Sequence, residues 1–326
     1  MKKVLCILIS LYLYNYCHSQ IREDIQIPVK IYHNNEKRVM NIPFYDSLLL
    51  SGEYEKSIIN NIKIVNDTTL KHFQVSYAIY MISIANILLG KIDSAYYYLD
   101  KFVNTSFDDR VIFVDRNLDT LKHYSDRWNS LVNKVEQKFV ENIGVIKDTN
   151  LAIRLFYLGI EDQKYRTILS FLRQYTEEDN YKAVTSHYAL QDSCMNIINQ
   201  YGVPTISMVG QFASNKFFLL IQHSEPKTQD KYYKLVKKAW KKGDFDSISY
   251  AMLTDRVLMG KKKKQIYGTQ LIKRSNDKKY PNQLYLYPVK DFKNLNKRRK
   301  KIGFTETIED WIKRQPEAFI PKEYYE

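Results

Sequence analysis

Cysteine is scarce in this chain, which holds only 3 in 326 residues. Cys6 and Cys17 lie in an N-terminal segment that we expect to be removed, so Cys194 alone would remain and no disulfide framework could form within the molecule. The apolar helical setting of Cys194 predicts a core thiol rather than a nucleophile. With 44% hydrophobic and 26% charged residues, the composition is that of a folded protein held by its core.

Long apolar runs are also missing. The apolar stretch from Val4 to Leu13 follows the basic pair Lys2-Lys3 and precedes Cys17-His18-Ser19, which is the order of a signal peptide. It is about ten residues long, too short to cross a membrane. We therefore predict a signal peptide over residues 1–19, export to the periplasm or the cell exterior, and no transmembrane segment after cleavage. A lipid anchor on Cys17 is the alternative, although the residues before it are not small.

The charge is strongly one-sided. Lysine and arginine number 50 against 36 acidic residues, giving a formal charge of +14, and loss of Lys2 and Lys3 with the leader removes two of these charges. A basic surface attracts anionic partners. Because an exported protein rarely meets nucleic acid, we expect no nucleic-acid partner, and the candidates are an envelope protein or an anionic polymer. The excess is concentrated in Lys261–Lys264, Lys273-Arg274, Lys278-Lys279 and Lys297–Lys301.

The N-terminal half shows one arrangement twice. A glycine is followed by a hydrophobic residue two positions on and a small residue five positions on, as in Gly52, Tyr54, Ser57 and in Gly90, Ile92, Ala95. The arrangement resembles the helix turn of a tetratricopeptide-like repeat, whose period is close to the spacing of the two glycines. Two such units offer little concave surface, so a packing role and a partner-docking role both stay open.

Charged residues occupy apolar positions in the C-terminal half. On helical wheels, Asp162, Asp192 and Asp255 each fall within the apolar stripe of a different helix. His223 ends a fourth helix, which follows Gly210 and is apolar on nearly every side. Buried carboxylates are costly unless they are paired. The pattern therefore predicts that these side chains turn inward and converge in one polar centre.

Near the end of the chain, the spacing of the hydrophobic residues changes from a helical to an alternating pattern. Gln265–Ile272 and Gln283–Pro288 alternate as two short strands joined by a lysine-rich loop, which predicts a β-hairpin. Gly268 in the first strand indicates a bulge or a close backbone approach. The fold class is thus mainly α, with tetratricopeptide-like hairpins followed by an α-dominated domain that carries one β-hairpin. We predict the domains as 1–19 (signal peptide), 20–141 (helical repeat) and 142–326 (the domain with the polar cluster).

Together these residues resemble an uncharacterised bacterial family, the domain of unknown function 6624. The resemblance covers roughly residues 150 to 312. It is carried by Asp162-Gln163-x-x-Arg166, Asp192, Gly210, Gln222-His223, Asp255-Arg256, Tyr267-Gly-Thr-Gln270 and Arg298-Arg299 with Gly303. Val203 replaces a tryptophan of the family pattern, and Glu225 replaces an aspartate. Because the family has no established activity, the resemblance implies which residues matter and not which reaction.

Two functions compete. The favoured one is a non-catalytic binding module in which the polar residues form a buried salt-bridge network that fixes one helical packing. Binding would then lie with the helical repeats, the tyrosine-rich surfaces or the basic hairpin. In such a module the polar cluster is sealed from solvent.

The alternative is a hydrolase acting on an envelope or extracellular substrate. His223 would be general acid or base, Asp255 would orient its ring, and Asp162 would join them. Arg166 and Arg256 would hold an anionic group. Substrate contacts would come from Gln222, Gln270, Tyr267, Asp192 and Gln163. No nucleophile elbow, phosphate loop or His-Glu-x-x-His pair supports this reading. We predict no metal or cofactor, with a magnesium or calcium site on Asp162, Asp192 and Asp255 as the alternative.

Overall fold

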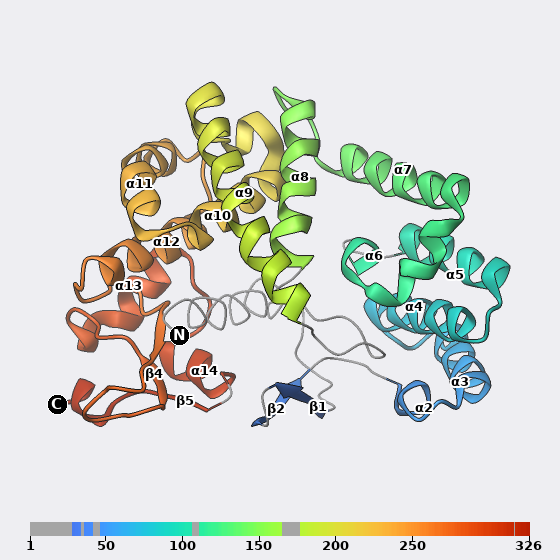
Figure 1. Cartoon of the computed structure of the whole chain (residues 1–326). Coiled ribbons are helices and arrows are strands. Elements are labelled where there is room, and N and C mark those ends of the chain that lie inside the picture. The colour runs from blue at the N-terminus through green and yellow to red at the C-terminus, as the bar shows by residue number, and fades with distance from the viewer. Residues whose placement is uncertain (1–27, 34–35, 42–45, 106–110, 165–176, 316) are drawn as a thin grey trace. The chain divides into compact units, whose positions relative to one another are not determined.

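The computed structural model describes residues 28–33, 36–41, 46–105, 111–164, 177–315 and 317–326 (Figure 1). The described part is mainly helical with short strands, which confirms the predicted fold class. Its helices divide into two compact units, the first ending at Asn142 and the second beginning at Ile143. The predicted signal peptide lies outside the described residues. No described helix is long and apolar enough to span a membrane.

The first unit opens with a strand pair and continues with helices. Strand β1 (Pro28–His33) pairs antiparallel with β2 (Glu36–Asn41), a partner that the sequence did not predict. Three helices follow and pack on one another in chain order: α3 (Tyr54–Asn66), α4 (His72–Leu88) and α5 (Ile92–Thr105). A short helix, α2 (Ser47–Leu50), precedes them.

The two glycine turns of this unit have the geometry that the repeat pattern requires. Gly52 and Gly90 both have positive φ, +81° and +70°, which is where a helix ends and the chain reverses at little cost only for glycine. Ser57 and Ala95 are both completely buried, so the small residue sits where helices approach closely. These turns agree with helical hairpins, while the repeat itself stays a prediction.

Helix α3 buries a different face from the one that its apolar residues suggest. Ile59 and Ile62 are exposed, whereas Asn61 is buried beside Ser57. Asn61 donates a hydrogen bond of 2.7 Å to Oδ2 of Asp46, which also accepts from the Ser57 hydroxyl. A polar contact thus anchors α3 to the segment before it.

A closing segment completes the first unit. It consists of α6 (Val111–Val114), a 3₁₀ helix η1 (Arg116–His123) and α7 (Ser125–Asn142). Asp115 caps η1 by accepting from the Asn117 backbone N–H at 2.8 Å, and it also accepts from the Tyr80 hydroxyl of α4. This one carboxylate therefore ties the closing segment to the helical core.

Five helices form the body of the second unit. They are α8 (Thr149–Lys164), α9 (Glu177–Tyr201), α10 (Ile206–His223), α11 (Pro226–Lys241) and α12 (Ser247–Gly260). Gly159 lets α8 pack tightly on α10, since a Cβ there would lie 2.6 Å from Cδ of the buried Lys216. Gly210, with φ +80°, breaks α10 near its start, as the sequence suggested.

A small sheet and short helices end the chain. Strand β3 (Leu271–Lys273) pairs antiparallel with β4 (Leu284–Leu286), which confirms the hairpin with shorter strands. A parallel third strand, β5 (Ala318–Phe319), joins β4 and was not predicted. Between them lie η2 (Phe292–Asn294), α13 (Leu295–Ile302) and α14 (Ile308–Lys313), and η3 (Lys322–Tyr324) follows.

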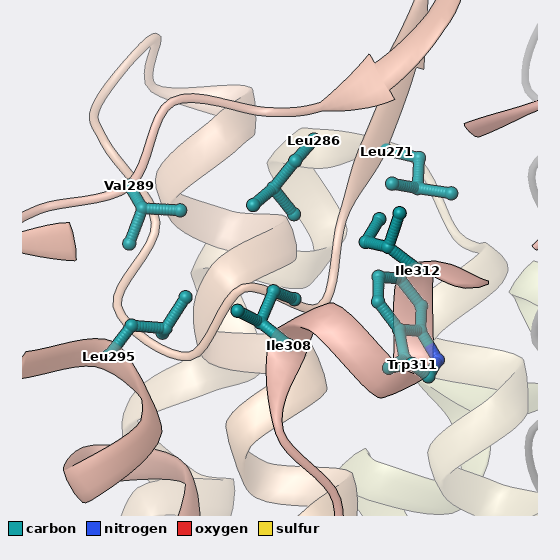
Figure 2. Packing of buried hydrophobic residues seen from close by; sticks show 7 residues of the cluster. All are labelled: Leu271, Leu286, Val289, Leu295, Ile308, Trp311 and Ile312. Atoms are coloured by element: carbon teal, nitrogen blue, oxygen red, sulfur yellow. The ribbon is translucent and has the colours of Figure 1, made fainter. Parts of the chain in front are cut away.

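One apolar cluster joins this sheet to the short helices. Figure 2 shows its side chains, those of the strands directed toward those of α14. The strands contribute leucines that alternate with residues of the opposite face, and α14 contributes an aromatic ring and two isoleucines. The members are Leu271, Leu286, Val289, Leu295, Ile308, Trp311 and Ile312. This cluster fixes the sheet beside α13, the helix that bears two arginines of the resemblance.

Candidate functional site

The ends of α8 and α10 bring a histidine and an aspartate together. Nδ1 of His223 lies 2.7 Å from Oδ2 and 3.0 Å from Oδ1 of Asp162. Their side chains are 5% and 2% exposed. We expected Asp255 to orient this ring, and the structure corrects the partner to Asp162, because Asp255 is held by a loop described below.

The residue before this histidine is also enclosed. Gln222 is 1% exposed, and neither its amide nitrogen nor its amide oxygen has a hydrogen-bond partner among the described residues. Its backbone carbonyl accepts from the side chain of Gln229 at 2.9 Å, which fixes the end of α10 against the start of α11. An amide left in this state keeps its capacity to donate and accept.

Asp255 holds the loop that follows α12. Its carboxylate is completely buried and accepts from the backbone N–H groups of Ile266, Tyr267 and Thr269, at 2.7 to 3.1 Å. The Thr269 hydroxyl donates to the same carboxylate at 3.0 Å. Four donor groups around one carboxylate make this residue the anchor of the segment Tyr267–Gln270.

Burial and hydrogen bonding oppose each other at Asp255. Burial is the larger effect and raises the pKa of this carboxyl to about 6, while the N–H groups of the loop and the Thr269 hydroxyl act to lower it. Burial therefore makes this carboxyl a weaker acid than an exposed aspartate. Tyr267 has its pKa raised by its own burial and by the nearby charge of Asp255.

Two arginines of α13 hold the same loop from the other side. Nε of Arg298 donates to the carbonyl of Ile266 at 3.0 Å, and Nη1 of Arg299 donates to the carbonyl of Tyr267 at 2.9 Å. Arg299 is 1% exposed and its guanidinium stacks over the ring of Phe304, 4.3 Å from the centroid. Ile266 and Tyr267 each donate their backbone N–H to Asp255 and present their carbonyl to one of these arginines. The loop is therefore held on both sides.

A glutamine that the sequence analysis missed also holds this loop, together with Asp255, Arg298 and Arg299. Gln265 is fully buried, and its amide donates to the carbonyls of Gln270 and Tyr287 while its oxygen accepts from the Gln270 N–H. Gln270, which we expected to face the polar centre, donates to the Met252 carbonyl at 3.4 Å and to the Thr269 hydroxyl at 2.9 Å. Only the position of Gln265 next to the Tyr-Gly-Thr-Gln run could have drawn attention to it.

The comparisons with known proteins bear on this region. Residues 186–322 match the model of a family of unknown function, DUF6624. The match confirms the resemblance of the C-terminal half. It includes His223, Asp255 and the loop that Asp255 holds, whereas Asp162 precedes it. No curated protein and no solved structure matches the chain.

One residue of the resemblance, Asp192, is exposed instead of buried. Asp192 is exposed on α9, where Cys194, Ile197 and Ile198 form the buried side, and this corrects its predicted place in an inward stripe. Burial raises the pKa of the Cys194 thiol to about 12, which suits a core residue.

Three further predicted site residues have only a partial description. Arg256 is half-buried on α12 beside Asp255. Arg166 lies outside the described residues, as does the side chain of Gln163.

The three predicted carboxylates do not form a common metal site. Asp162 is paired with His223, Asp255 is enclosed by the loop that follows α12, and Asp192 faces solvent. Within the described ranges, no group of three histidine, cysteine or acidic side chains could hold a metal ion. The alternative of a magnesium or calcium site on these three residues is therefore wrong.

Proposed function

We propose that this protein is an exported, non-catalytic binding module in which the polar residues of the DUF6624 region build a structural core. The observation that carries the proposal is the state of Asp255. It has no exposed surface, and its oxygens already accept from the backbone N–H groups of Ile266, Tyr267 and Thr269. A carboxylate used in this way fixes a loop and has little capacity left for a substrate.

The histidine supports the same conclusion. His223 and Asp162 are almost fully enclosed, which matches a sealed pair between two helices. A buried pair of hydrogen-bonded polar groups can specify one packing without adding much net stability, and removing one partner is destabilising. The binding function would then be carried by exposed surfaces of the module.

Thermal unfolding of single variants tests the proposal. His223→Gln and Asp255→Asn should each lower the melting temperature of the full chain by several degrees, because each change leaves buried hydrogen-bonding groups without a proper partner, at a cost of about 1–3 kcal/mol per group. Glu141→Gln, at an exposed residue of α7, is a control that should not shift it. Polar residues kept for catalysis are instead neutral or costly to stability. Unchanged or higher melting temperatures for both site variants would therefore refute the structural role.

A hydrolase is the second candidate, and one observation favours it. The paired His223 stands next to Gln222, whose buried amide could hydrogen bond a polarised oxygen of a substrate. Turnover of chromogenic ester or phosphoester substrates that disappears in both His223→Gln and Gln222→Ala would support this candidate. Turnover that persists in His223→Gln would exclude the histidine as its acid or base.

A further inference from the structure

Helix α11 has two very different faces. The face packed on α12 and α10 is buried and carries Thr228, Tyr232, Val236 and Ala239. The opposite face is occupied by lysines at Lys227, Lys231, Lys234, Lys238 and Lys241, all exposed. We call these five residues the lysine stripe. Figure 1 shows α11 next to α12 in the second unit.

The lysine stripe is a regular row. Its members follow each other by four, three, four and three residues, which keeps them on one side of an α-helix. At a rise of 1.5 Å per residue, the row is roughly 21 Å long with a charge every ~5 Å. The buried face holds the helix in place, so the charges are displayed on a rigid support.

The charges of the row are only partly compensated within the protein: Nζ of Lys231 lies 4.9 Å from the ring centroid of Tyr232, and the helix dipole favours Lys238 and Lys241 in the last turn. None of the five lysines forms an ion pair with another described residue, and Asp230, the acid within α11, pairs instead with Lys261. Like charges three and four positions apart repel each other on a helix. Lys227 also lies in the first turn, where the helix dipole disfavours a cation. This repulsion would be relieved by an anionic partner laid along the helix.

We infer that the lysine stripe binds an extended polymer that carries phosphate groups. This inference rests on the proposed binding function and names its class of partner. Each lysine is exposed and separately contributes little, because solvent screens a single surface ion pair. A polymer engages the whole row at once and releases several counterions, which is how such rows gain affinity.

The residue types point to phosphate. The row contains lysine only, a compact point charge that binds phosphate oxygens without a fixed geometry, which suits groups repeated along a flexible chain. Single-stranded nucleic acids are usually bound through aromatic platforms beside the basic groove. On α11 the rings instead turn to α12, where Tyr250 stacks on Tyr233 and on Trp240. The stripe therefore suits a charged backbone without bases.

The test compares two variants of equal charge. One replaces all five stripe lysines with glutamine, which keeps helix propensity. The control makes five Lys→Gln changes at Lys263, Lys278, Lys293, Lys300 and Lys301, which are exposed elsewhere in the same unit. Binding of the full chain to fluorescently labelled long-chain inorganic polyphosphate is measured over a range of salt concentrations. Circular dichroism checks that each variant keeps its helices.

The expected result separates the stripe from net charge. The stripe variant should lose more than about tenfold in affinity near 0.1 M salt, with the slope of log Kd against log salt reduced by about 3, and the control should change far less. Equal losses in both variants would overturn the inference, as would no binding by the unaltered chain. Tighter binding of polyglutamate or of a single-stranded oligonucleotide than of polyphosphate would also overturn it. None of these results changes the melting behaviour that tests the structural role of Asp255.

Discussion

The imidazole of His223 meets the carboxylate of Asp162 across 61 residues of sequence, with Nδ1 2.7 Å from Oδ2. An ionised carboxylate only accepts, so when Asp162 is ionised Nδ1 of His223 is the donor of this hydrogen bond. The contact joins the last turn of α8 to the last turn of α10. Because both side chains are buried, the pair defines how these two helix ends are aligned.

A double-mutant cycle should detect this pairing. We expect Asp162→Asn and His223→Gln each to reduce the free energy of unfolding by about 3 kcal/mol, because each leaves one buried partner unsatisfied. The double variant should lose clearly less than the sum, with a coupling energy above ~1 kcal/mol. Urea unfolding measures all three. The exposed pair of Lys134 and Asp100 serves as control and should show coupling near zero. Additive losses at His223 and Asp162 would contradict the pairing.

Asp255 and Asp192 offer a matched comparison of two motif aspartates. Asp255→Asn places an amide against the N–H groups of Ile266 and Thr269, so the free energy of unfolding should fall by about 3 kcal/mol. Asp192→Asn alters an exposed side chain and should have no measurable effect. Chemical denaturation of both variants decides this. If Asp192→Asn proved the more damaging, the assignment of buried and exposed faces on α9 would be wrong.

Helical periodicity found Asp162 and Asp255 and failed at Asp192 for a physical reason. Helix α9 has apolar residues on more than one side, and the side that carries Asp192 also carries Tyr181 and Tyr188. Those tyrosines are 70% and 41% exposed, which their polar hydroxyls tolerate, while Cys194 and Ile197 are completely buried. Periodicity alone cannot rank two stripes when one consists of amphipathic side chains.

Partners were harder to predict than positions. The sequence pattern indicated His223 and Asp255 correctly as enclosed residues. The aspartate beside His223 depends on how α8 meets α10, and the donors to Asp255 depend on a loop that turns back 11 to 14 residues later. Strand β5 was missed because its two residues carry no period. Such contacts are set by tertiary packing, which a single sequence does not encode in its local pattern.

Asp115 should make the stability of the first unit depend on pH. Burial raises the pKa of this carboxyl to about 7, against the lowering effect of the Tyr80 hydroxyl. Between pH ~4 and ~7 the folded state therefore binds more protons than the unfolded state, so stability falls as pH rises, by up to about 1.4 kcal/mol per pH unit.

Asp115→Asn tests this dependence, because a neutral amide can still accept from the Asn117 N–H. Urea unfolding at several pH values should show a flatter profile in this variant, while Asp126→Asn, at an exposed residue of α7, should keep the original slope. A stability that instead rises with pH over this window in the unaltered chain, and loses that rise in Asp115→Asn, would show that the pKa of Asp115 is lowered rather than raised.

Gly268 has both a positive φ and close contacts around the position of a Cβ, whereas Gly243 has only the positive φ. It has φ +70°, and a Cβ there would lie 3.1 Å from Cδ2 of Leu295 and 3.2 Å from Cδ1 of Ile308, inside the apolar cluster of Figure 2. Gly243, after α11, has φ +75° with nothing within 4 Å. Gly243→Ala should therefore cost about 1 kcal/mol from backbone strain alone. Gly268→Ala should cost about 2–4 kcal/mol, because overpacking is added to the same strain. Equal losses in thermal or urea unfolding would mean that the loop held by Asp255 and Arg299 can move away from the cluster without cost.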